Sequence, residues 1–140
     1  MRLLFYTSKG DRRMKWLEEQ LAGLRPLSIE FCRDLDTLGH GLRQPGSEKV
    51  LAVLLAASQD ELHEILTLQP WLNGKPLILI LPDRDKDTIA KGHVLAPRFL
   101  TDAQGDFREI YEILSKMVEI YLHQGRRQWQ REISGLADYL

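Results

Sequence analysis

The chain has 140 residues and a formal net charge of −1, and its hydrophobic and charged fractions are those of an ordinary globular protein. This length suits one domain with a proper core, and the near-neutral charge offers no electrostatic case for nucleic acid or an anionic membrane as a partner. Residues 1–6 are too few for a signal peptide, and no apolar run is long enough to cross a bilayer. We therefore expect a cytoplasmic protein.

The first third of the chain predicts strand, helix, strand. Residues 3–7 read as the first strand, and apolar residues then recur at helical spacing from Met14 to Leu24. Pro26 bars further helix, and residues 27–32 resume as a strand with β-branched and aromatic content. Cys32, the single cysteine, falls in this strand and is expected to be a buried structural thiol rather than a reactive one.

The middle of the chain predicts the centre of a parallel sheet. Residues 34–42 carry a helical pattern that Gly39 and Gly41 weaken. The unbroken apolar run 49–58 is typical of a strand buried on both faces, and 77–81 repeats it. Between them Ser58 and Glu61 have the form of a capping box that opens a helix, which Pro70 and the turn after it close.

The last third predicts a short helix at 88–91, a strand at 98–101 and a strong amphipathic helix from Asp106. Five strand–helix units predict an α/β fold: a doubly wound, five-stranded parallel sheet of order 2-1-3-4-5 with helices on both faces. An extra C-terminal helix follows. We therefore divide the chain into an α/β domain over 1–124 and a helical extension over 125–140.

In element order and in the character of strands three and four, residues 1–122 resemble a response-regulator receiver domain, the phospho-accepting module of bacterial two-component signalling. The resemblance implies an acidic pair after strand one that binds magnesium, a phosphorylated aspartate after strand three, a small hydroxyl residue after strand four and a lysine after strand five. At those places this chain has Thr7 and Ser8, Ala56 or Ala57, Pro82, and Thr101 or Asp102. Because phosphoryl transfer to a carboxylate needs a carboxylate, we expect a degenerate, pseudo-receiver domain without enzymatic activity.

A candidate anion site lies at the turn after strand one. Thr7, Ser8, Lys9 and Gly10 stand where flavodoxin-like proteins cradle a phosphate, with backbone N–H groups, a helix dipole and two hydroxyls. In the other interpretation, Ser8 or Asp11 caps the first helix.

Other polar residues admit a structural explanation. Ser58 could be imagined as a nucleophile, but its place in a capping box explains it. A cation could settle among Asp83, Asp85, Asp87 and Asp102, although Arg84 and Lys86 already neutralise this loop and the spacing is not that of a calcium loop. The four histidines, His40, His63, His93 and His123, fall in separate elements without metal-ligand spacing. We predict no metal and no cofactor.

The C-terminal extension carries an apolar stripe. Trp129, Ile133, Leu136 and Leu140 recur at helical spacing on a helix that either continues through Gly125 or begins anew after it. Either the extension folds back over its own domain, or it presents Trp129 and its neighbours to another chain. The second interpretation predicts a non-catalytic interaction module, most simply a homodimer. The alternative function is a binder of a flavin or another phosphate-bearing small molecule at the turn after strand one.

Overall fold

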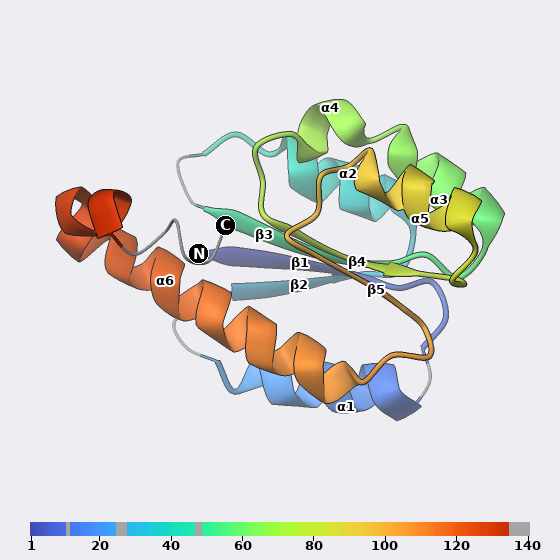
Figure 1. Ribbon diagram of the computed structural model, residues 1–140, viewed down its shortest axis with the longest axis horizontal. Helices are drawn as coiled ribbons and strands as arrows, with labels where there is room; N and C mark the ends of the chain where they lie inside the picture. Colours follow the sequence, from blue (N-terminus) through green and yellow to red (C-terminus); the bar gives the residue numbers. More distant parts are fainter. Residues whose placement is uncertain (11, 25–27, 47–48, 135–140) are drawn as a thin grey trace.

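The computed structural model describes residues 1–10, 12–24, 28–46 and 49–134. Its centre is one sheet of five parallel strands in the order β2-β1-β3-β4-β5 (Figure 1). The strands are β1 (Arg2–Tyr6), β2 (Ser28–Cys32), β3 (Val50–Leu55), β4 (Leu77–Leu81) and β5 (Phe99–Asp102). The predicted α/β class and the predicted strand order are confirmed.

Helices cover both faces of the sheet. They are α1 (Arg12–Ala22), α2 (Leu35–Arg43), α3 (Gln59–Leu66), α4 (Gln69–Leu72), α5 (Lys86–His93) and α6 (Phe107–Ser134). The pair α1 and α6 lies against one face, and α2 to α5 lie against the other (Figure 1). The predicted doubly wound arrangement is therefore present.

Alternation along the strands explains the unbroken apolar runs. Successive side chains of a strand point to opposite faces, so a strand covered on both sides must be apolar at every position. In β3, Val53 packs with the α1–α6 layer and Leu54 with the α2–α5 layer, and both are fully buried. In β4, Ile80 and Leu79 divide in the same way.

The structure differs from the expected elements at Pro70. This proline was predicted to close the helix after β3, but it lies in the first turn of α4, directly after the end of α3. The first turn of a helix tolerates proline because its N–H groups have no intrahelical acceptor. The buried Leu72 explains why the chain folds into this extra turn, since it adds to the core beneath α2 to α5.

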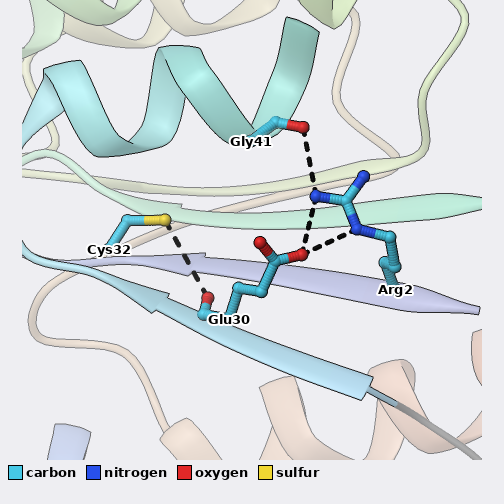
Figure 2. A network of polar contacts seen from close by, with 4 residues as sticks. All are labelled: Arg2, Glu30, Cys32 and Gly41. Carbon is cyan, nitrogen blue, oxygen red and sulfur yellow. Dashed lines mark hydrogen bonds and ion pairs between the residues drawn. The ribbon is translucent and has the colours of Figure 1, made fainter. Parts of the chain in front are cut away.

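A polar contact ties the amino edge of the sheet together (Figure 2). The Arg2 guanidinium of β1 pairs with the Glu30 carboxylate of β2, with Nε 2.7 Å from Oε2, and also donates to the Gly41 carbonyl of α2 at 3.2 Å. The Arg2 side chain is only 13% exposed, so its charge requires these acceptors. Cys32 lies beside them and is buried, and burial raises the pKa of its thiol to about 11.

Two glycines of α2 differ in their surroundings, which predicts opposite effects of the same substitution. A Cβ on Gly41 would lie 3.0 Å from Leu4 Cδ2, whereas a Cβ on Gly39 would meet nothing closer than 3.5 Å. Alanine is more favourable than glycine inside a helix by about 0.5–1 kcal/mol, and this gain applies to both substitutions. We expect Gly39→Ala to raise the free energy of unfolding by about that amount, and Gly41→Ala to lower it by about 1 kcal/mol through overpacking. Urea titration of both variants checks this, and equal shifts would contradict it.

The longest helix, α6, passes the edge of the sheet. It is continuous from Phe107 to Ser134, so the chain does not break at Gly125. Val118 and Ile120 are among its buried side chains, and the Tyr121 ring lies under the Lys49 ammonium, 4.9 Å from the ring centre, beside the start of β3. The later turns, orange to red in Figure 1, lie beyond the ends at which the strands begin.

Candidate functional site

The carboxyl ends of the strands define the candidate site. All five strands are parallel, so the residues that follow them share one edge, where α/β proteins bind ligands. The Thr7 N–H donates to the Cys32 carbonyl and the Ala56 N–H to the Ile80 carbonyl, which continues the pairing by one residue beyond β1 and β3. Because β1 also pairs with β3, the residues singled out after these two strands lie next to one another.

Glu61 is the centre of the polar contacts between β1 and α3. Its Oε2 accepts a hydrogen bond from Ser8 Oγ at 2.7 Å, and its Oε1 accepts one from the Ala57 N–H at 3.3 Å. The phenol of the buried Tyr6 lies close to the same carboxylate. Burial, followed by the interaction with Glu61 and its negative charge, raises the pKa of Tyr6 well above its usual range. A single carboxylate thus joins the end of β1 to the start of α3.

Ser58 has the structural role that the sequence predicts. It is the N-cap of α3, and its Oγ accepts a hydrogen bond from the Glu61 N–H at 3.2 Å. In a standard capping box, the carboxylate of the third helical residue accepts a hydrogen bond from the backbone N–H of the N-cap. Here the Glu61 carboxylate accepts instead from the backbone N–H of Ala57, the residue before the N-cap Ser58. The hydroxyl is therefore engaged as a cap.

The hydroxyls of the turn from Thr7 to Gly10 already donate hydrogen bonds to other groups of the protein. Thr7 is fully buried, and its Oγ1 donates to the Lys9 carbonyl at 2.9 Å. The Ser8 hydroxyl donates to Glu61. An anion at this turn would therefore displace Ser8 from a carboxylate and lie beside that negative charge. Asp11, the alternative cap of α1, lies outside the described residues.

The carboxylates after β4 and β5 are engaged in two separate groups. Gln59 Nε2 donates to Asp83 Oδ2 at 2.8 Å and to the buried Thr88 hydroxyl at 2.6 Å. A hydrogen bond from Thr88, together with those from the Asp85 backbone and Gln59, lowers the pKa of Asp83. This group fixes the start of α5 against α3.

In the second group, Arg84 Nε donates to Asp102 Oδ2 at 2.7 Å, and the Gln104 N–H donates to Asp102 Oδ1 at 2.9 Å. Arg84 and Asp102 border a hollow of about 200 Å³ between the ends of β4 and β5. The Asp102 carboxylate is only 16% exposed, and the arginine neutralises it. The pair therefore fixes two loops to each other.

The described residues at this edge assemble neither a metal site nor a histidine beside Ser58. No group of three His, Cys, Asp or Glu side chains in this part of the chain could hold a metal ion. His40, His63 and His93 are exposed on α2, α3 and α5, so they do not converge on Ser58. The position that follows β3 is Ala56, which has no group to accept a phosphoryl transfer.

The predicted interface residues divide between described and undescribed positions. Trp129 and Ile133 belong to α6, whereas Leu136 and Leu140 lie outside the described residues. Their spacing of four places Trp129 and Ile133 on one side of the helix.

Comparison with known proteins yields no relative: no family model matches the chain, and no curated protein or solved structure matches significantly. Within the described residues, no helix combines the length and the apolar character that crossing a lipid bilayer requires.

Two features of this edge were not foreseen from the sequence. One is the contact of Glu61 with Tyr6 and Ser8, which joins residues more than fifty positions apart. The other is a gathering of cationic side chains from α1, α6 and the residue after β2. Their positions in the sequence could have indicated both features. Every residue involved lies at or just beyond the carboxyl end of a strand, or early in the helix that follows it.

Proposed function

We propose that this protein is a non-catalytic, receiver-like interaction module of cytoplasmic signalling that acts as a homodimer. The observation that carries the proposal is the length of α6, which runs to Ser134 and whose later turns lie beyond the ends at which the strands begin (Figure 1). A helical stretch that leaves its own domain needs another surface for stability, because isolated helices of this length are marginal in water.

The carboxyl edge supports a non-catalytic role. The hydroxyls of Thr7 and Ser8 and the carboxylates of Asp83 and Asp102 bond to neighbouring protein groups. An alanine follows the central strand where a receiver carries its phosphorylated aspartate. An interaction module needs only a stable domain and a surface for the partner. The α/β domain supplies the first, and the projecting turns of α6 supply the second.

A second copy is the economical partner for this helix. Trp129 and Ile133 share one side of the projecting turns, and large aromatic residues frequently anchor interfaces. Most homo-oligomers are closed and two-fold, so two such helices would pack against each other symmetrically. Nearer the sheet, Ile113, Met117 and Tyr121 of the same helix are partly buried and pack against the core beneath α1 and α6.

Removal of residues 124–140 is expected to convert a dimer into a folded monomer. Light scattering measures the mass, and circular dichroism measures the retained fold. Trp129→Ala/Ile133→Ala should weaken the dimer in the full chain, whereas the matched pair Arg127→Ala/Arg131→Ala should leave it intact. A full chain that stays monomeric at high micromolar concentration would refute self-association. Loss of folding on truncation would show instead that the extension belongs to the core of its own domain.

A further inference from the structure

A cluster of cationic side chains lies at the carboxyl edge of the sheet, on the side covered by α1 and α6. Two adjoining hollows of about 470 and 490 Å³ share Arg12 as a lining residue. Arg13 and Arg108 line the first, and Lys15 and Arg33 line the second. We call the two hollows together the basic groove.

Aromatic contacts fix the walls of the basic groove. The Arg13 guanidinium lies over the ring of the buried Phe107, 4.5 Å from its centre, and so links the first turns of α1 and α6. Trp16 is half-buried and meets Tyr111 edge to face, with ring centres 6.2 Å apart. Because the two helices also pack side by side (Figure 1), the groove has a fixed floor rather than a set of independent surface charges.

Cationic side chains outnumber carboxylates among the described residues that line the groove. Five cationic side chains line it, against the carboxylates of Glu18 and Asp106. Glu18 pairs with Arg33 at 2.9 Å, while Asp106 lies 3.8 Å from Arg108 and accepts its backbone N–H. The Arg108 side chain remains 80% exposed. The surface therefore carries local positive charge on a chain whose net charge is −1.

We propose that the basic groove binds an acidic segment of a partner protein, a function that goes beyond self-association. Arginine forks match carboxylates in two-pronged geometry, and the half-buried Trp16 offers an apolar contact beside them. Both hollows are open and adjoin at Arg12 across the first turns of α1, which suits an extended segment better than a small ligand that a pocket would enclose.

Charge balance favours an acidic peptide over nucleic acid. Outside the basic groove the chain is net negative, and Asp60, Asp83 and Asp85 lie at the same edge beside α3 and α5. A long polyanion gains its affinity from many phosphate contacts, which this limited surface does not provide. A short acidic segment needs only the few cations that the groove gathers.

The test measures fluorescence anisotropy of a labelled glutamate-rich peptide with the full chain. Arg12→Glu/Arg108→Glu is the test variant, and Lys86→Glu/Lys116→Glu, on exposed positions of α5 and α6, changes the net charge equally. Both groove substitutions place an acid in the first turn of a helix, where it is tolerated, so folding should persist and circular dichroism checks it. We expect the groove variant to bind about tenfold more weakly and the control to bind like the parent.

Several outcomes would overturn the proposal. These are absence of peptide binding by the parent chain, equal losses in the two double variants, or tighter binding of a single-stranded oligonucleotide that the groove variant abolishes. The last result would assign the groove to nucleic acid instead. Because the oligomeric state is measured separately by light scattering, failure here is distinguishable from failure of the proposed dimer.

Discussion

Replacement of Leu54 or Ile80 by alanine is expected to lower the free energy of unfolding by about 2–5 kcal/mol. Both side chains are fully buried in the two central strands, and they face opposite helical layers. Each truncation removes apolar contacts and leaves a cavity that helices packed on a rigid sheet cannot close completely. Urea denaturation followed by circular dichroism measures the change.

Val94→Ala is the control for these core substitutions, because its side chain is 52% exposed. We expect its effect to stay within about 0.5 kcal/mol. Since Leu54 and Ile80 lie in different layers, similar large losses from both would show that each layer contributes to one cooperative core. A loss of only a few tenths from either would mean that its strand is not central to stability.

Glu61→Ala is expected to lower the free energy of unfolding by about 2–3 kcal/mol, although the residue is only half-buried. The substitution removes the carboxylate beside the buried Tyr6 phenol and the acceptor of the Ala57 N–H, and a buried donor without an acceptor retains its full desolvation penalty. The exposed bond to Ser8 contributes less, since water replaces it. Thermal and urea unfolding measure the loss.

Two control variants distinguish the loss of the Glu61 carboxylate from the effect of substituting any residue of α3. Glu64→Ala removes an exposed acid from the same helix and should change stability by less than about 0.5 kcal/mol. Glu61→Gln keeps an acceptor oxygen but loses the charge, so it should fall between the parent and Glu61→Ala. If Glu61→Ala and Glu64→Ala were equally mild, the contact with Tyr6 would contribute nothing to stability.

The sequence predicts the sheet because its central strands are buried on both faces. A run such as β4 must be apolar at each position, so its bounds are predicted correctly at 77–81. At β5 all four residues are only partly buried, and the strand lies at Phe99–Asp102, one residue later than predicted. The α4 turn escapes prediction because Pro70 is compatible both with ending a helix and with starting one.

The candidate site is less predictable because its contacts cross the chain. Capping by Ser58 follows from local spacing, and the structure confirms it. Glu61 lies close to Tyr6 because β1 pairs with β3. This pairing is set by the strand order of the whole sheet and not by the local sequence of β1 or α3. The basic groove requires α1, α6 and the end of β2 together, and its charges are dispersed along the sequence.

The course of α6 determines how a dimer could engage its partners. The helix starts at the carboxyl edge beside the basic groove and leaves the domain at the opposite edge, so Arg108 and Trp129 are separated by about 30 Å of helix. A two-fold pairing through the far ends would therefore leave both grooves unobstructed and pointing outward. Such a dimer would be a bivalent receptor for the proposed acidic segments. A target carrying two acidic segments would then be retained by avidity, even when each single contact is short-lived.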